Sequence, residues 1–212
     1  MTRVLVADDH PVVRTGLKEI IARQRDMAVM GEAATGAEVC RLVAMKPWDV
    51  VILDLSLPDR SGLEVLKEIK RERPKIPVLV LTAYHDEQFA VRAIRAGAAG
   101  YLTKGATPEE LISAIRRLAQ GRRYMSPAVA EELIETLGHH SDEAPHQRLS
   151  DREYQVLCLL GSGKTVSQIA QELGRSVKTI STHRARILEK LEMQSTAQLV
   201  RYVLERRLAE PE

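Results

Sequence analysis

The N-terminal part of the chain alternates short runs of β-branched and aliphatic residues with longer segments of helical periodicity. The apolar runs predict strands, and because their apolar positions are consecutive they are typical of a parallel sheet that is buried on both faces. The predicted strands are residues 3–7, 27–33, 49–54, 77–82 and 98–103. The predicted helices are residues 12–24, 36–45, 62–72, 87–96 and 108–120. This alternation predicts an α/β fold, a (βα)5 doubly wound parallel-sheet domain.

The C-terminal part of the chain carries helical patterns only, and each is introduced by a capping signal. The signals are the S/T-x-x-E/Q capping boxes of Ser150 with Glu153, Thr165 with Gln168 and Ser195 with Gln198, and the N-cap Ser176. The predicted helices are residues 151–161, 166–173, 177–192 and 196–208. Only the turn 174–176 separates the second helix from the third, which is the spacing of a helix-turn-helix. We therefore expect an all-α four-helix domain after the α/β domain.

A connecting segment lies between the two patterns. Ser126 and Pro127 predict the start of a helix and Gly138 predicts its end, and a polar stretch without apolar periodicity follows. The histidines of this stretch have no carboxylate or thiol at ligand spacing, so we expect a solvated linker rather than a metal site. They are His139, His140 and His146. The predicted organisation is a first domain over 1–121, a helical and flexible linker over 122–147, and a second domain over 148–212.

The net charge of +2 is the sum of three segments that differ in sign and size. Residues 1–125 hold 20 Lys and Arg against 16 Asp and Glu, which gives +4. Residues 126–147 hold five acids and no Lys or Arg, which gives −5, and residues 148–212 hold 11 bases against eight acids, which gives +3. Aromatic residues make up only 3% of the chain, which argues against a surface that stacks single-stranded bases.

The sequence also indicates the compartment. No run approaches the roughly 18 consecutive apolar residues of a membrane span, and an acidic pair follows the first short apolar run, unlike a secretory signal. Cys40 and Cys158 lie far apart in apolar helical patterns and belong to no CxxC motif. We expect reduced, buried thiols in a cytoplasmic protein.

Polar side chains gather where the predicted strands end. Carboxylates follow the first strand and end the third, a hydroxyl ends the fourth, and an ammonium follows the fifth: Asp8, Asp9, Asp54, Thr82 and Lys104. Ligands of doubly wound sheets bind outside the carboxyl ends of the strands. Three carboxylates need a cation, and oxygen ligands of this kind suit Mg²⁺. The hydroxyl and the ammonium suit a phosphoryl group, which an aspartate nucleophile can accept as an acyl phosphate.

This set of residues resembles the CheY-like receiver domain of two-component response regulators, over residues 1–121. The resemblance implies that Asp54 accepts phosphate from a histidine kinase. It implies a Mg²⁺ site formed by Asp9 and Asp54, by Asp8 through water, and by the backbone carbonyl of Ser56. It further implies a switch made of Thr82, Tyr101 and Lys104. Gly105 stands where many receivers have proline, a replacement common in the NarL/FixJ group. We expect no enzymatic activity beyond assistance of the protein's own phosphorylation and dephosphorylation.

Two enzymatic alternatives also fit parts of the sequence. Hydrolases that form a phospho-aspartate use an Asp-x-Asp motif, but Ser56 occupies the second position and cannot act as a general acid. The stretch GSGKT at residues 161–165 suggests a P-loop, but GxxxxGKT requires glycine at Cys158, and the preceding segment is helical rather than a strand. We therefore expect a turn before a helix at this position.

The third predicted helix of the second domain has two unlike faces. At 100° per residue, its apolar residues fall on one face, which we expect to pack inward: Val177, Ile180, Ile187, Leu188 and Leu191. Lys178, Thr182, Ala185 and Arg186 fall on the opposite face. Residues 175–190 hold five Lys and Arg residues and one acid, Glu189, which gives a local net charge of +4. Small residues between long basic ones suit the DNA major groove, although a solvated charged face is the usual interpretation of an isolated helix.

Residues 148–208 resemble the LuxR-type helix-turn-helix, and the stretch that carries the resemblance is LSDREYQVLCLLGSGKTVSQIAQELGRSVKTISTHRARILEKL. The resemblance implies sequence-specific binding of duplex promoter DNA as a homodimer, with RNA polymerase as a further partner. It implies base contacts from Ser181, Thr182 and Ala185. It implies phosphate contacts from Lys178, His183, Arg186 and Lys190. Two rival functions remain at this stage, a catalytic phosphotransfer protein with incidental basic helices and a DNA-binding protein that does not depend on phosphorylation.

Overall fold

The structure is a computed structural model of the chain, and it describes residues 1–83, 87–125, 129–131, 144–206 and 208. The chain forms two compact units, residues 1–131 and 132–212, and each is described by itself. The predicted helix ends at Ser126, Pro127 and Gly138 lie outside the described residues, as do His139 and His140. None of the helices within the described ranges is both long enough and apolar enough to span a membrane.

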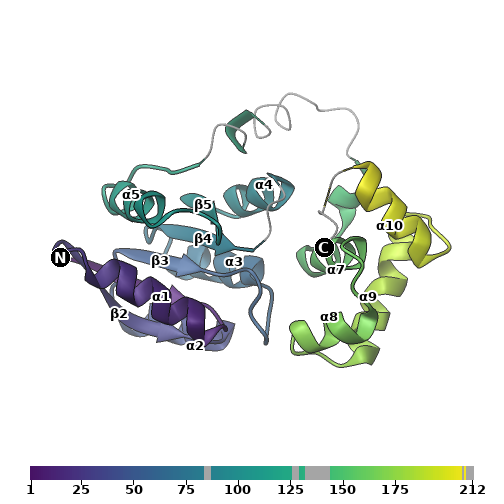
Figure 1. Cartoon of the computed structure of the whole chain (residues 1–212), viewed down its shortest axis with the longest axis horizontal. Coiled ribbons are helices and arrows are strands. Elements are labelled where there is room, and N and C mark those ends of the chain that lie inside the picture. Colours follow the sequence, from purple (N-terminus) through teal and green to yellow (C-terminus); the bar gives the residue numbers. More distant parts are fainter. Residues whose placement is uncertain (84–86, 126–128, 132–143, 207, 209–212) are drawn as a thin grey trace. The chain divides into compact units, whose positions relative to one another are not determined.

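The first unit contains a five-stranded parallel sheet with the order β2-β1-β3-β4-β5 (Figure 1). The strands are β1 (Thr2–Ala7), β2 (Met27–Ala33), β3 (Val50–Leu53), β4 (Val78–Thr82) and β5 (Gly100–Thr103). Every residue of β3 and β4 is buried, as their consecutive apolar residues predict. The predicted α/β parallel-sheet fold is confirmed.

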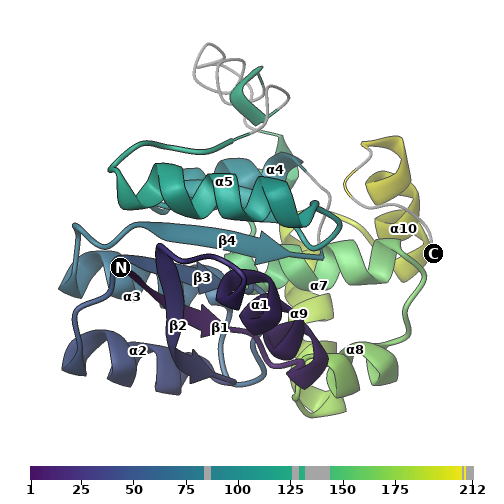
Figure 2. The ribbon, with the colours of Figure 1, turned by 60° about the vertical axis from the view of Figure 1, so that its left-hand side comes forward.

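Helices of the first unit lie against the sheet, as Figure 2 shows; four connect successive strands, and the last follows β5. They are α1 (Pro11–Ala22), α2 (Gly36–Met45), α3 (Gly62–Glu72), α4 (Glu87–Arg95) and α5 (Pro108–Ala119). The helices α1 and α5 share one core with the sheet, in which Leu17, Ile21 and Ile115 pack with Val6 and Ile52. Because crossovers between parallel strands are right-handed, α2, α3 and α4 cover the opposite face, where α2 contacts α3 and α3 contacts α4. Because all five strands run parallel, their carboxyl ends, which carry the candidate residues, meet at one edge of the sheet.

The second unit consists of helices and a short 3-10 turn. Its elements are η1 (Pro145–Arg148), α7 (Asp151–Gly161), α8 (Val166–Glu172), α9 (Val177–Lys190) and α10 (Thr196–Glu205). The caps are those that the sequence predicts: Ser150, Thr165 and Ser195 form complete capping boxes, and the Ser176 side chain accepts the Thr179 N–H. The predicted four-helix domain is confirmed.

The turn between α7 and α8 decides the P-loop alternative. Residue 161 ends a helix instead of following a strand, and Gly163 has a φ of 90°, which permits the tight turn toward Thr165. A Cβ atom on Gly161 would collide with the Val203 side chain, so a glycine here lets α7 and α10 pack closely. The glycines of GSGKT thus serve the turn and the helix packing.

The prediction that His146 belongs to a solvated linker is wrong. His146 lies in η1 and is 1% exposed. Its Nδ1 atom lies 2.7 Å from the Tyr202 hydroxyl, and its ring lies 6.0 Å from the ring of Tyr154. Hydrophobic periodicity does not reveal a single buried histidine within a polar stretch, so the sequence pattern did not indicate this contact.

Candidate functional site

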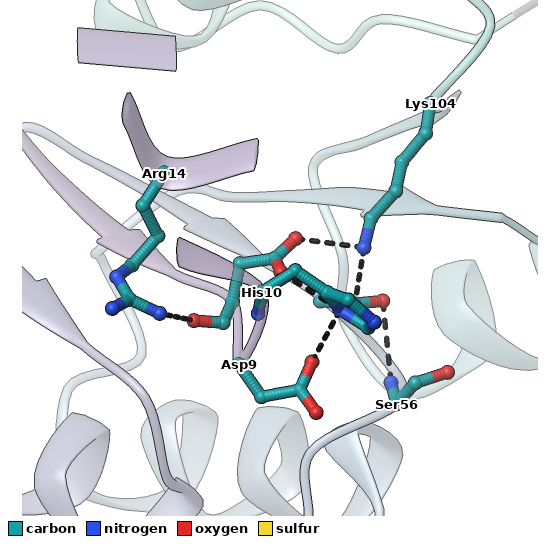
Figure 3. Close-up of polar contacts among 7 residues, drawn as sticks. Asp9, His10, Arg14, Ser56 and Lys104 are labelled. Carbon is teal, nitrogen blue, oxygen red and sulfur yellow. Dashed lines mark hydrogen bonds and ion pairs between the residues drawn. The ribbon is translucent and has the colours of Figure 1, made fainter. Parts of the chain in front are cut away.

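An ammonium and two buried carboxylates lie together at the carboxyl edge of the sheet (Figure 3). The Nζ atom of Lys104 lies 2.7 Å from Oδ2 of Asp54 and 2.7 Å from Oδ2 of Asp8. Asp54 directly follows β3, Asp8 follows β1 and Lys104 follows β5, so three strands bring these groups together. Asp8 and Asp54 are 2% and 1% exposed, which means that their charges are compensated by protein groups rather than by bulk water.

Burial controls the ionisation of this cluster. Burial raises the pKa of Asp54 above its ordinary value of 3.8; the Lys104 ammonium opposes this increase and the Asp8 carboxylate adds to it. Burial alone would lower the pKa of Lys104, but the Asp54 and Asp8 carboxylates outweigh burial and raise it above 10.5. Lys104 therefore remains a cation at neutral pH. Its charge favours the ionised form of the Asp54 carboxyl, which is the form that can act as a nucleophile.

The loop from β1 to α1 supplies further groups. Nδ1 of His10 lies 2.7 Å from Oδ1 of Asp9, and the His10 backbone N–H donates to Oδ1 of Asp8 at 2.8 Å. Arg14, in the first turns of α1, donates from its guanidinium to the backbone carbonyl of Asp8 at 2.6 Å. Neither His10 nor Arg14 was predicted from the sequence. The signal that could have found Arg14 is a basic residue about one helical turn after an acidic loop, from where its side chain reaches back.

The acidic cluster is typical of Mg²⁺ sites. Ligand atoms of Asp8, Asp9, His10 and Asp54 lie within 4.8 Å of one another. Within the described part of the chain, Oδ1 of Asp9 is buried and accepts no hydrogen bond of good geometry, although His10 lies near it. Clustered carboxylates with an oxygen lacking a donor fit a hard divalent cation, which prefers oxygen ligands.

The loop from β3 to α3 begins with a tight turn. The Ser56 backbone N–H donates to Oδ1 of Asp54 at 3.2 Å, and the Gly62 backbone N–H donates to the Leu55 carbonyl at 3.0 Å. A Cβ atom on Gly62 would collide with the backbone of Asp54 and lie 2.5 Å from Cα of Leu55. Only glycine permits this approach, so the start of α3 holds the backbone of Asp54 and Leu55 from one side.

The predicted switch residues lie on the two neighbouring strands of the same edge. Thr82 ends β4 and is fully buried, and its carbonyl accepts the Lys104 N–H at 2.8 Å. Tyr101 lies on β5 and is 6% exposed, so its ring is already buried in this structure. Thr82 and Lys104 are thus joined by a backbone hydrogen bond, and Tyr101 lies on β5, the strand that leads to Lys104.

The second unit presents the basic face of α9. The predicted outward residues Lys178, Thr182, Ala185 and Arg186 are all exposed. On the opposite face Ile180, Ile187 and Leu191 are buried and Leu188 is half-buried. The prediction that Val177 packs inward is wrong, since it is 50% exposed. Val177 is the first residue of α9, and the first buried residue of this helix is Ile180.

Three side chains assigned to DNA contacts are engaged within the unit. Lys190 Nζ lies 2.6 Å from Oε2 of Glu153, and the Thr182 hydroxyl donates to the Lys178 carbonyl at 2.9 Å. His183 is half-buried, and burial together with the nearby Arg152 lowers its pKa below 6.5. His183 is therefore neutral at pH 7 and offers no charge to a phosphate. Ser181 is half-buried at the edge of the exposed face.

Comparisons with known proteins cover both units. Residues 4–116 match the family described as the response regulator receiver domain. Residues 147–203 match the luxR family of bacterial regulatory proteins. The two matches correspond to the α/β unit with its acidic edge and to the helical unit with the basic α9.

Similar proteins match over nearly the whole chain. The response regulator GacA of Pseudomonas aeruginosa is 38% identical, with 94% of each chain covered. The oxygen regulatory protein NreC of Staphylococcus carnosus is 38% identical, with 97% of this chain and 98% of NreC covered. The solved structure of RcsB from Salmonella enterica serovar Typhimurium, bound to promoter rprA in the presence of phosphomimetic BeF3−, is 29% identical. Its TM-score is 0.64, and the match covers 95% of this chain and 97% of RcsB.

Proposed function

This chain belongs to the NarL/FixJ group of two-component response regulators, with a receiver domain and a LuxR-type DNA-binding domain, and we propose that phosphorylation of Asp54 switches its binding to promoter DNA. It is a DNA-binding transcriptional regulator of a two-component phosphorelay. The observation that carries the proposal is the Lys104 ammonium placed between Asp54 and Asp8 at 2.7 Å from each. A buried carboxylate with an adjacent fixed cation is a suitable acceptor for a phosphoryl group.

The chemical step is a phosphoryl transfer from a phosphohistidine of the kinase. A carboxylate oxygen of Asp54 attacks phosphorus, the new P–O bond forms, and the P–N bond to the imidazole breaks. The electron pair of that bond leaves with the imidazole, which takes a proton and becomes neutral histidine. Lys104 stabilises the negative charge of the transferred phosphoryl oxygens, since its ammonium already lies at hydrogen-bond distance from Asp54.

The residues present fit a Mg²⁺ cofactor. Asp9 and Asp54 would hold the ion directly, together with the Ser56 carbonyl, and Asp8 would act through a water molecule. When bound, the ion neutralises the carboxylates and the phosphoryl oxygens. The chain's own contribution is to keep the carboxylates in place: Arg14 holds the Asp8 backbone, and Ser56 orients the Asp54 carboxylate through its backbone N–H.

The switch and the output follow from the remaining residues. Thr82 and Tyr101 would adjust to the phosphorylated Asp54 and shift an existing equilibrium between two receiver conformations. A homodimer would then place two copies of α9 in successive major grooves, as half-sites of a two-fold operator require. Support comes from the solved structure of RcsB dimers bound to DNA. The partners would be a histidine kinase, duplex promoter DNA and RNA polymerase, in the cytoplasm.

We further propose that the chain catalyses no reaction on other substrates. Ser56 stands where a phospho-aspartate hydrolase carries its general acid, and a hydroxyl cannot supply that proton at neutral pH.

The experiment that tests the switch is selection of duplex DNA from a random library by the full chain, with and without acetyl phosphate and Mg²⁺. Enrichment of a two-fold sequence that grows with acetyl phosphate is expected. Equal enrichment without the phosphoryl donor would favour a DNA-binding protein that does not depend on phosphorylation.

A further inference from the structure

The start of α2 lies between the two loops that carry the candidate site. At one end, the Ala33 carbonyl accepts the Asp8 backbone N–H at 3.1 Å. At the other end, the Gly36 and Ala37 N–H groups donate to Oδ1 and Oδ2 of Asp59 at 2.7 Å and 2.9 Å. Asp8 belongs to the loop after β1, and Asp59 belongs to the loop after β3. The segment 33–37 therefore connects the two acid-bearing loops through hydrogen bonds.

Asp59 completes the N-terminus of α2. The N-cap Thr35 accepts the Glu38 N–H at 3.2 Å, and the Glu38 side chain accepts the Ala34 N–H at 2.7 Å. The N–H groups of the first two helical residues remain, and both go to Asp59, which comes from another loop. Burial alone would raise the pKa of Asp59, but these backbone donors outweigh burial and hold the pKa below 3.8. The carboxylate is therefore ionised at neutral pH, as this contact requires.

The two segments also approach too closely for a side chain between them. A Cβ atom on Gly36 would lie 2.5 Å from Cγ of Arg60 and 2.6 Å from Cγ2 of Val65. Arg60 continues the attachment, since its guanidinium contacts Oε2 of Glu68 at 2.5 Å and lies 3.7 Å from Sγ of Cys40. The end of the loop after β3 is thus fixed to both α2 and α3.

The fixed ends leave little freedom to the residues between them. Gly62 holds the backbone of Asp54 and Leu55 from the α3 side, and Asp59 holds the loop from the α2 side. Ser56 lies between these attachments, and its carbonyl is the backbone ligand of the proposed Mg²⁺ site. The position of Ser56 relative to Asp8 and Asp9 therefore depends on the contact between Asp59 and α2.

We propose that Asp59 is a positioning residue of the phosphorylation pocket, which sets the separation between the Ser56 carbonyl and the Asp8 and Asp9 carboxylates. This inference rests on the proposed function of the pocket. Mg²⁺ requires near-ideal octahedral geometry, so it tolerates less displacement of a ligand than a larger cation would. Residues that orient the ligands of a metal commonly affect its affinity by about tenfold or more.

The test measures Mg²⁺ binding to the full chain by isothermal titration calorimetry, with Asp59→Ala, Asp59→Asn and the control Asp49→Ala. Asp49 also accepts a backbone N–H with its carboxylate, from Arg3 at 2.7 Å, but it precedes β3, at the opposite end of the strand from the pocket. The amide of Asp59→Asn keeps one acceptor for the two N–H groups. We expect the Kd for Mg²⁺ to rise about tenfold in Asp59→Ala, less in Asp59→Asn, and to stay unchanged in Asp49→Ala.

The outcomes separate the inference from the function on which it rests. If wild-type protein binds Mg²⁺ and takes a phosphoryl group, and both Asp59 variants bind Mg²⁺ as wild type does, Asp59 only caps α2 and the inference is wrong. If Asp59→Ala does not fold, as judged by circular dichroism, the same comparison with Asp59→Asn decides the question. If wild-type protein neither binds Mg²⁺ nor takes a phosphoryl group, the proposed function fails and the inference fails with it.

Discussion

The Nζ atom of Lys190 lies 2.6 Å from Oε2 of Glu153. Lys190 is in the last turn of α9 and Glu153 is in the first turn of α7, where its carboxylate also accepts the Ser150 N–H at 2.8 Å. The Glu153 side chain is 4% exposed, so the pair is shielded on the acid side although the lysine is partly solvated. The contact fixes the basic helix against the first helix of its domain.

The first prediction concerns this pair. Glu153→Gln lowers the free energy of unfolding by about 1 kcal/mol at pH 7, because the amide keeps a hydrogen bond but loses the charge pair. Burial acts to raise the pKa of Glu153, but Lys190 and Ser150 hold it below its ordinary 4.5. The pair therefore contributes fully above about pH 4.5, and its contribution is lost as the pH falls through the lowered pKa. Urea denaturation of both proteins at pH 7 and below pH 4 measures this, and an equal difference at both pH values would argue against the pair.

The second prediction concerns DNA affinity. Lys178 is exposed on the outward face of α9, and the described structure gives its ammonium no carboxylate at ion-pair distance. Lys178→Ala should weaken binding to the selected operator and reduce the slope of log K against log salt by about one. Lys164→Ala is the matched control, because the Lys164 ammonium lies 2.9 Å from Glu172. Equal slopes for Lys178→Ala and wild type in a fluorescence anisotropy titration would remove Lys178 from the interface.

The third prediction concerns the thiols. Burial, together with Glu68, raises the pKa of Cys40 to about 11, although the residue is only half-buried, contrary to the sequence prediction of full burial. At pH 8 only about one Cys40 in a thousand is then a thiolate. Cys158 is buried as predicted. Iodoacetamide should modify neither thiol readily in the folded protein at pH 8 and both in urea, as counted by intact mass. Fast modification of the folded protein would contradict the environment described for Cys40.

The fourth prediction separates phosphorylation from its consequence. Thr82 is buried beside the pocket but carries no charge and attacks no phosphorus. Thr82→Ala should therefore still take a phosphoryl group from acetyl phosphate, while the phosphorylation-dependent increase in DNA affinity is lost. Thr82→Ser, which keeps the hydroxyl, should retain part of that increase. An undiminished increase in Thr82→Ala would show that the hydroxyl does not act as the switch.

The fold was largely predictable from the sequence, because local patterns define it. The bounds of β2, α2 and α3 agree with the predicted ranges, and each capping box forms as the spacing of its two residues requires. The position of Asp54 and Lys104 at one edge was likewise accessible, since all carboxyl ends of a parallel sheet meet there.

Contacts between distant residues that do not lie at the carboxyl ends of the strands were not predictable. Asp59 meets α2 across 22 and 23 residues, Lys190 meets Glu153 across 37, and His146 meets Tyr202 across 56. Each uses a polar side chain whose place in the sequence follows no periodic pattern, so the sequence does not indicate the contact. These contacts nevertheless hold the pocket loop, the basic helix α9 and the short turn η1 in place.

The most direct test of the account is the intact mass of the full chain after incubation with acetyl phosphate and Mg²⁺. We predict one phosphoryl adduct in wild-type protein, which disappears when Mg²⁺ is chelated beforehand and is absent from Asp54→Ala. A wild-type protein without an adduct, or an adduct that persists in Asp54→Ala, would contradict the assignment of Asp54 as the phosphoryl acceptor.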